Sequence, residues 1–402
     1  MYRAARFATV MAYLYSILFG VIAFTYDLET GYVTKKTPLT TYCLLINFLT
    51  VSCVIYFGRN MELKMESSDK PDLHNKILVA LTFIRILGVS LTLVNNWWRR
   101  DEFIHNLNTF KAFRERFLRK HSTNKRYEEY FNQQIVLKFG IGALCEVIMF
   151  YGSVRIMRQI FSDFCRHTVF GLMSTVLNLM ACHYFFIALS VRILFCIIAD
   201  ELRRLLTTME NLFADFHTKC IGPGLLSVKS CQLADEFDDL SGMHTELQVL
   251  SEKINSMFYV QGCCVFLILY LNNICVLYIY YMLAKQVELG PQFSHAILYF
   301  LPLALLLYYA DGYMLIDLVL RYMDAIEMPA QLLKDCAAWL PILDRRLEES
   351  VKLFSLKMAA FPVSRSLLYL FDVTRPMVFA TITSTITNAI VLVQYDYQYN
   401  ET

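Results

Sequence analysis

Long apolar runs recur along almost the whole sequence, and they constrain the fold more than any other feature. A membrane-crossing helix needs about 20 consecutive, mostly apolar residues. Eight runs approach or exceed that length: 7–24, 39–57, 77–98, 135–157, 169–199, 257–284, 294–318 and 361–395. The chain is also only 18% charged, whereas soluble domains contain about 25% charged residues. The sequence therefore predicts an all-α membrane protein with several transmembrane helices.

Lysine and arginine are concentrated in alternate connections between these runs. The basic connections 99–134, 200–256 and 321–360 contain nine, five and six of them. The other connections contain four, two and one, at 58–76, 158–168 and 285–293. Because cytoplasmic connections carry the excess of positive charge, we place the three basic connections in the cytoplasm and the C-terminus outside the cell.

The first apolar run, 7–24, is the shortest and has a faintly polar face formed by Tyr13, Ser16 and Gly20. If it crosses the membrane, the chain has eight spans and an outside N-terminus. We favour the alternative: seven transmembrane helices plus an N-terminal amphipathic or re-entrant helix, with the N-terminus in the cytoplasm. The C-terminus is extracellular on either reading.

The cytoplasmic connections are expected to be helical, because apolar residues such as Phe110, Phe113 and Phe117 recur at helical spacing. The second span is expected to continue directly into such a helix, and 221–224 (Ile-Gly-Pro-Gly) is the expected break in the long connection. We divide the chain as follows: an N-terminal cytoplasmic segment with an interfacial helix, 1–38; transmembrane helices 1–4 with the cytoplasmic extension 99–134, 39–199; a long cytoplasmic connection, 200–256; transmembrane helices 5–6, 257–318; a cytoplasmic anchor helix, 319–360; and helix 7 with a short extracellular tail, 361–402.

Two ionisable residues lie near the middle of predicted spans, Arg85 in the second and Glu146 in the third. Such residues are energetically costly in a membrane and usually mark a function or an ion pair. Antiparallel neighbouring helices would put the two at similar depth, so a structural ion pair and a functional pocket are equally acceptable. An unpaired Glu146 would suit a cationic ligand.

The outer halves of the predicted spans contain further polar and aromatic residues among apolar ones. Small-molecule sites have this composition, and we expect the ligand-binding residues to be Glu146, Asn178, Asn273, Tyr278 and Tyr299. Hydrogen bonding between helices explains the two asparagines equally well.

The sequence contains no nucleotide-binding P-loop, no zinc-protease motif and no motif that carries an acyl-transfer nucleophile. Cysteine and histidine show no metal-ligand spacing. We therefore expect no enzyme, no catalytic residue, no metal and no cofactor. The net charge of only +2 argues against a nucleic-acid partner.

The last span is unusually polar for a helix that faces only lipid. Seven residues turn a helix through 700°, so Thr387 and Gln394 share a face, with Ile390 and Val391 between them. A pore lined by hydroxyls and amides around an aliphatic constriction would have this pattern. The alternative is that the hydroxyls bond back to their own helix and the amides, Asn388 among them, pack between helices.

The C-terminal segment resembles the insect gustatory receptors, relatives of the insect odorant receptors. Their last helix carries Thr-Tyr, five mostly hydrophobic residues, then Gln and an aromatic residue. Thr387, Asn388, 389–393, Gln394 and Tyr395 fill those positions. Two positions differ from the family pattern: Asn388 replaces the Tyr, and Tyr395 replaces the usual Phe. If the family Tyr packs against a neighbouring helix, Asn388 must do so with hydrogen bonds.

The resemblance implies a tastant-gated, non-selective cation channel in the plasma membrane of gustatory dendrites, a homo- or hetero-tetramer with other gustatory receptor subunits. Its partners would be the lipid bilayer and a small-molecule tastant, with bitter the commoner class. The last helix of each subunit would line a central pore at Thr387, Ile390, Val391 and Gln394. Two alternatives stay open: a G-protein-coupled heptahelical receptor, and a secondary transporter with Arg85 and Glu146 in its substrate path.

Overall fold

The described chain is almost entirely helical, because a helix satisfies its own backbone hydrogen bonds where a bilayer offers no water. The computed structural model describes residues 2–27, 30–66, 73–121, 125–156, 161–218, 221–284, 295–336, 344–360, 366–367, 371–372 and 374–401. The helices are α1 Tyr2–Leu18, α2 Thr37–Glu66, α3 Leu73–Trp98, α4 Arg100–Lys120, α5 Lys125–Ile156, α6 Phe161–His217, α7 Pro223–Met257, α8 Tyr259–Ala284, α9 His295–Cys336, α10 Arg345–Ala360 and α11 Arg375–Glu401.

Two short antiparallel hairpins complete the described structure. β1 (Thr25–Tyr26) pairs with β2 (Val33–Thr34), with Thr25 opposite Thr34. β3 (Ser366–Leu367) pairs with β4 (Phe371–Asp372), with Ser366 opposite Asp372. The all-helical, multi-span architecture predicted from the sequence is thus confirmed.

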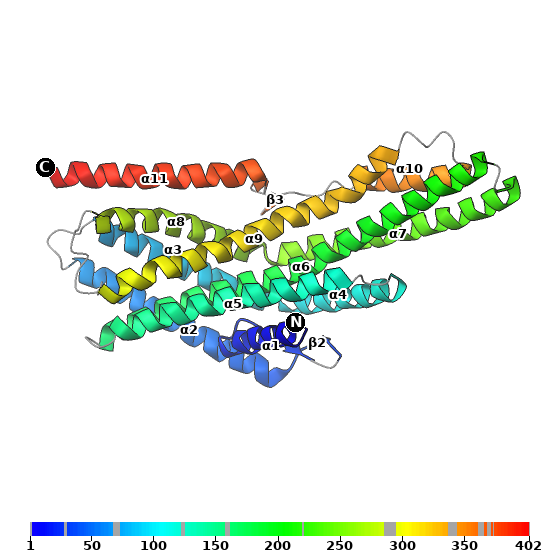
Figure 1. Ribbon diagram of the computed structural model, residues 1–402. Helices are drawn as coiled ribbons and strands as arrows, with labels where there is room; N and C mark the ends of the chain where they lie inside the picture. Colours follow the sequence, from blue (N-terminus) through cyan, green and yellow to red (C-terminus); the bar gives the residue numbers. More distant parts are fainter. Residues whose placement is uncertain are drawn as a thin grey trace.

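The long helices lie side by side along one axis and make an elongated molecule (Figure 1). The C-terminus and the ends that face the connections α2–α3, α5–α6 and α8–α9 lie at one end. The other end contains α10, most of α4 and α7, and the last part of α6. The three basic connections therefore lie together at one end, as the alternation of spans predicts.

Helix α6 is the centre of the packing. It is the longest described helix, with 57 residues, and it contacts α9, α5, α7 and α3. Phe195, Ile198 and Leu202 on α6 are fully buried. One continuous cluster of buried apolar residues follows α6 from the bundle of spans into α4, α7 and α10.

The helices at the basic end bury the apolar stripes that the sequence shows. Phe113 and Phe117 of α4, Phe237 of α7, and Leu347 and Phe354 of α10 are all buried in that shared cluster. The predicted break at 221–224 is also confirmed, because α6 ends at His217 and α7 begins at Pro223, with Gly222 as its N-cap. Proline fits the first turn of a helix, where no backbone hydrogen bond is lost.

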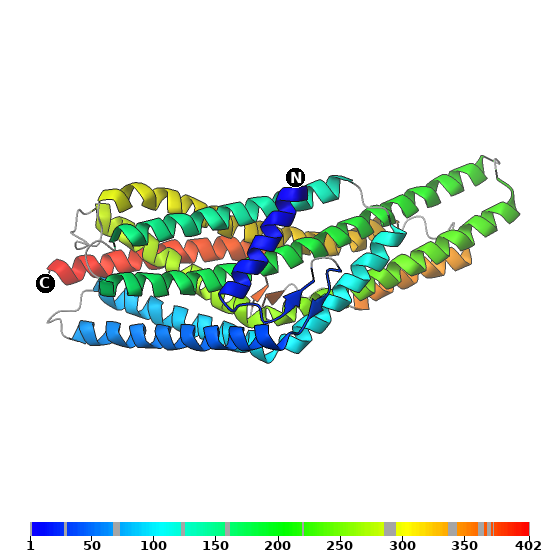
Figure 2. The ribbon, with the colours of Figure 1, turned by 90° about the horizontal axis from the view of Figure 1, so that it is seen from below.

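Helix α1 crosses the other helices at a steep angle instead of running parallel to them (Figure 2). It buries small residues at helical spacing, Ala5, Ala8, Ala12 and Ser16, against α5 and α6. The Ser16 hydroxyl lies 2.6 Å from Nε2 of His183 on α6. The chain reverses direction just after α1, at Gly20, whose φ of +66° is accessible to glycine without strain.

Three helix boundaries differ from the expected segment boundaries. The second span does not continue unbroken into the cytoplasm, because α3 ends at Trp98 and α4 begins at Arg100. The last helix begins at Arg375 and not at residue 361, because Thr374 caps it: the Met377 N–H donates to the Thr374 hydroxyl over 3.3 Å. Helix α9 continues past residue 318, where we expect the sixth span to end, as far as Cys336.

Within the described residues, four helical segments are long and apolar enough to cross a membrane: Val79–Trp98, Gly171–His217, Tyr259–Tyr278 and Arg375–Gln398. Helix α1, which has 17 residues, is not among them. The number of crossings and their sidedness stay predictions.

Candidate functional site

Helix α11 presents the predicted pore residues on one face and Ser384 and Asn388 on a second stripe, about 100° round the helix. Within the described residues its extensive contact is with α8, along one edge of the bundle (Figure 1). The predicted pore residues Thr387, Ile390, Val391 and Gln394 lie on the exposed part of the helix, and Ile390 and Val391 are 51% and 53% exposed. The chain therefore leaves the face that the sequence assigns to a pore uncovered.

The threonine hydroxyls of α11 bond back to their own helix. Thr383 donates to the Phe379 carbonyl over 3.1 Å, and Thr387 donates to the Thr383 carbonyl over 2.9 Å. This satisfies each hydroxyl proton without a neighbouring helix. The hydroxyl oxygens keep their remaining lone pairs, so an exposed threonine can still accept a hydrogen bond from water.

The second stripe of α11 is bonded to α8. The Asn388 Nδ2 donates to the Tyr270 hydroxyl over 2.7 Å, and that hydroxyl lies 2.8 Å from the Ser384 hydroxyl. Further along, the Tyr278 hydroxyl donates to the Asp396 carboxylate over 3.2 Å. Asn388 thus packs against a neighbouring helix through hydrogen bonds.

Glu146 of α5 is held by two neutral donors on α6. Its carboxylate accepts from the Thr175 hydroxyl and from the Asn178 amide, each over 2.9 Å. Thr175 and Asn178 are three residues apart, so they lie on the same face of α6. The contact joins two of the predicted ligand-binding residues, Glu146 and Asn178.

Arg85 of α3 belongs to a separate network. Its Nη2 donates to the Asn272 side-chain oxygen over 2.6 Å, and the Asn272 amide donates to the Tyr308 hydroxyl over 3.4 Å. These bonds tie α3 to α8 and α9. Arg85 and Glu146 therefore take different partners and do not form the ion pair that the sequence allowed.

Of the other three predicted ligand-binding residues, the structure describes the side chains of Tyr278 and Asn273. Tyr278 is buried at the contact between α8 and α11. The side-chain oxygen of Asn273 is buried on α8 and has no hydrogen-bond partner within the described residues. Tyr299 belongs to α9, but its side chain lies outside the described part of the chain.

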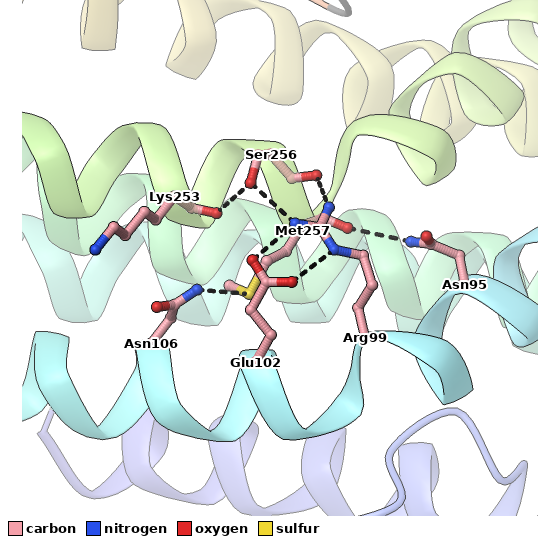
Figure 3. Close-up of polar contacts among 7 residues, drawn as sticks. All are labelled: Asn95, Arg99, Glu102, Asn106, Lys253, Ser256 and Met257. Atoms are coloured by element: carbon pink, nitrogen blue, oxygen red, sulfur yellow. Dashed lines mark hydrogen bonds and ion pairs between the residues drawn. The ribbon is translucent and has the colours of Figure 1, made fainter.

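A polar junction joins the two helix breaks at the base of the spans (Figure 3). Arg99, the residue between α3 and α4, donates to the carbonyl of Ser256 and to its hydroxyl, the latter over 3.2 Å. It also forms a bidentate pair with Glu102 at 2.9 and 2.8 Å. The Asn95 amide donates to the carbonyl of Met257, where α7 ends, over 3.3 Å.

This junction is a feature that the sequence patterns do not indicate. Both breaks fall inside runs with helical spacing, at Arg99 and at Phe258. Phe258 is buried against Phe103 and Tyr184, with ring centroids 5.4 Å apart in both cases. The one available sequence signal is the cluster of Asn95, Asn96, Arg99 and Arg100 after an apolar span.

Comparison with sequence families gives one match over nearly the whole chain. A family model described as "7tm Chemosensory receptor" matches residues 11–399. Two proteins of Drosophila melanogaster, named as gustatory receptors 59d and 36b, are 25% and 23% identical to the chain. Each alignment covers 96% of the chain and 97% of the relative.

Comparison with solved structures matches the fold. The insect olfactory receptor OR5 from Machilis hrabei aligns over 96% of this chain and 97% of its own, with a TM-score of 0.62 and 10% identity. The structure of the same receptor in complex with eugenol aligns with a TM-score of 0.57 and 11% identity. At this level of identity the likeness concerns the fold.

Proposed function

Because this chain belongs to the 7tm chemosensory receptor family, we propose that it is a gustatory receptor that acts as a tastant-gated, non-selective cation channel. Four subunits, identical or mixed with other gustatory receptors, would surround a central pore lined by α11. The N-terminus would lie in the cytoplasm and the C-terminus outside the cell. The plasma membrane of gustatory neurons, including their dendrites, is the proposed location.

The observation that carries this proposal is the free face of α11. A single helix cannot enclose a pore, but copies related by a closed rotational symmetry can. Within one chain, the Ser384 and Asn388 stripe of α11 packs against α8, and Thr387, Ile390, Val391 and Gln394 remain exposed. Gln394 and Thr387 would offer uncharged oxygens to hydrated cations, while Ile390 and Val391 would close the pore by dewetting.

The proposed tastant is a small molecule that binds in the outer half of the bundle and carries positive charge. Glu146 accepts hydrogen bonds from Thr175 and Asn178, and neither donor neutralises a carboxylate charge. Arg85, the cation that the sequence offered as its partner, is bonded to Asn272. Bitter compounds, many of them cationic alkaloids, fit this chemistry better than sugars. Asn273, Tyr278 and Tyr299 are retained as proposed members of the pocket.

The separate partners of Arg85 and Glu146 favour the channel over the transporter alternative. A transporter in which the two form one charged substrate path would need them adjacent, and they are not bonded to each other. The basic end of the molecule favours a cytoplasmic N-terminus over the outside N-terminus of a G-protein-coupled receptor.

The pore assignment is tested with cysteine substitutions on the two faces of α11. Thr387→Cys and Gln394→Cys should let a water-soluble, charged thiol reagent reduce tastant-evoked currents, because both positions would face the aqueous axis. Ala389→Cys is the matched control, since Ala389 is 5% exposed and faces the bundle. Wild-type protein measures the background from native cysteines.

Equal modification of all three variants, or none, would reject α11 as the pore lining. Gln394→Ala gives a second measurement that does not depend on a reagent. It should change single-channel conductance or gating, and unaltered tastant-evoked currents in that variant would reject the role of Gln394.

A further inference from the structure

A cavity of about 540 Å³ lies at the base of the bundle, and none of the predicted tastant-binding residues is among its described lining. Helix α1 covers one side, residues 20–24, 26, 31 and 33 another, and α2, α3, α4, α6 and Phe258 the rest. Most of the wall is apolar and includes Val10, Ile22 and Ile187. The function proposed above does not use this space.

Charged side chains are found at the α3–α4 part of the wall. Arg100, Lys111 and Arg114 all line the cavity, and Glu115 is the single carboxylate among the lining residues. Lys111 pairs with Glu115 at 3.3 Å, and its ammonium also lies 3.6 Å from the centre of the Tyr32 ring. The described lining therefore keeps a net charge of two positive units.

Two of these cationic groups are incompletely bonded. The buried Nζ of Lys111 and Nε of Arg100 each face one carboxylate, that of Glu115 at 3.3 Å and that of Asp101 at 3.5 Å, but neither contact has hydrogen-bond geometry. The Arg100 guanidinium stacks 5.0 Å from the centre of the Trp97 ring and donates from Nη1 to the Thr40 hydroxyl over 3.1 Å. Burying a donor without a well-aligned acceptor is unfavourable, so an anionic oxygen in the cavity would stabilise both cations.

The cavity also lies next to a surface suited to lipid. The face of α1 that points away from the bundle exposes Phe7, Leu14 and Leu18, at 63%, 51% and 56%. Its other face contributes Val10 and Ala12 to the cavity wall. A molecule in the cavity would thus be separated from the bilayer by a single helix made largely of small residues on its inner side.

From this combination we infer that the cavity binds an anionic phospholipid. An acyl chain would occupy the apolar part beside α1 and α6, and the phosphate would contact Lys111, Arg114 and Arg100. Basic pockets between transmembrane helices on the cytoplasmic side are suited to anionic headgroups, which are concentrated in that leaflet. The choice of leaflet depends on the orientation proposed above, whereas the binding itself does not.

The test uses full-length protein in nanodiscs containing a photoactivatable phosphatidylserine in a phosphatidylcholine background. Crosslinked peptides are mapped by mass spectrometry. We expect crosslinks in α1, α4 and the 20–33 segment. The double variant Lys111→Gln, Arg114→Gln should reduce them at least tenfold, because the phosphate loses two cationic contacts.

The matched control is Arg119→Gln, Lys125→Gln, which removes the same charge from exposed positions that do not line the cavity. An equal loss in this control would show only a general attraction to charge and would overturn the site. Leu107→Trp, which narrows the cavity without a change of charge, should also reduce crosslinking.

Two further arms identify what is bound. Photoactivatable phosphatidylcholine that labels the same peptides as strongly would overturn the role of the cations. Soluble glycerophosphoserine that competes as well as the intact lipid would overturn the role of the apolar wall. Labelling does not require channel activity, so a failed pore assignment and a failed lipid site give different results.

Discussion

At the scale of single residues, Asn388 shows how a substitution in a short signature is accommodated. The resemblance leads one to expect a tyrosine there, and a phenol is indeed present at this contact, but α8 supplies it as Tyr270. The Asn388 amide bonds that phenol over 2.7 Å and the Ser384 hydroxyl over 3.3 Å. The hydrogen-bonding expectation for Asn388 is met, although a sequence cannot tell which helix supplies its partner.

Glu146 gives a prediction about ligand charge. Glu146→Gln preserves the shape of the side chain and an acceptor for Thr175 or Asn178 but removes the negative charge. We expect the concentration of a cationic tastant needed for half-maximal current to rise about tenfold, since one ion pair in a partly buried site is worth about 1.4 kcal/mol.

Uncharged tastants should keep their potency in this variant. Arg85→Gln is the comparison, because it removes a charge at similar depth from a network that does not contact Glu146. A parallel loss for charged and uncharged tastants would show that Glu146 is structural.

His244 predicts a dependence of stability on pH at the basic end. It lies on α7 between Phe195 and Phe354, and its Nε2 has no hydrogen-bond partner within the described residues. Burial lowers the pKa of His244 from 6.5 to about 4, because the charged imidazole is poorly solvated there. The unfolded chain therefore binds the proton more readily than the folded chain.

The resulting stability is fully present above about pH 6.5 and is lost as the pH falls toward 4. The slope from this group reaches about 1.4 kcal/mol per pH unit. His244→Phe should flatten the fall in apparent melting temperature between pH 7 and pH 5. An unchanged pH profile in that variant would mean that other groups govern the acid sensitivity.

At the scale of helices, the Arg99 junction connects the break between α3 and α4 to the break between α7 and α8. Its guanidinium links the start of α4 to the end of α7 through Ser256, and its side chain is 28% exposed. Arg99→Ala should lower the free energy of unfolding by about 2 kcal/mol, because hydrogen bonds to a charged group contribute about 1.5–3 kcal/mol.

A matched arginine is Arg345, whose side chain is 92% exposed and pairs with Glu349 on the same helix. Arg345→Ala should change the apparent melting temperature little, because exposed pairs contribute little. Similar shifts in melting temperature for the two variants would contradict a stabilising role of the Arg99 junction. Tastant-evoked currents of the Arg99 variant would show whether the junction also affects gating.

The sequence predicted helices well and their ends less well. Apolar runs and the phenylalanines of α4 predicted helices correctly, because the residues that are buried in the structure recur at the same helical spacing. The helix breaks at Arg99 and Phe258 were not predicted, since neither contains proline or glycine and both are stabilised by contacts between distant segments. For the same reason the sequence could offer Glu146 and Asn178 as candidates by residue type, while it could not give the partners Asn272 and Tyr308 of the Arg85 network.

At the scale of the whole molecule, the arrangement of the termini is directly testable. The basic connections lie together at the end opposite the C-terminus. On intact cells, an antibody should bind a C-terminal tag but reach an N-terminal tag only after permeabilisation. The opposite result would reverse the proposed orientation and revive the G-protein-coupled alternative. A cytosolic enzyme marker confirms that the cells are intact.

The attachment of α11 along one edge has a consequence for how such receptors diversify. In the described chain, side-chain bonds from α11 to the bundle include those to Tyr270 and Tyr278 of α8 and to Asp324 of α9. The exposed residues Thr387, Ile390, Val391 and Gln394 take no part in these bonds, so substitutions there leave them intact. On the function proposed above, the outer pocket and the last helix could then vary independently, so that ligand range and conduction would evolve as separate traits in one chain.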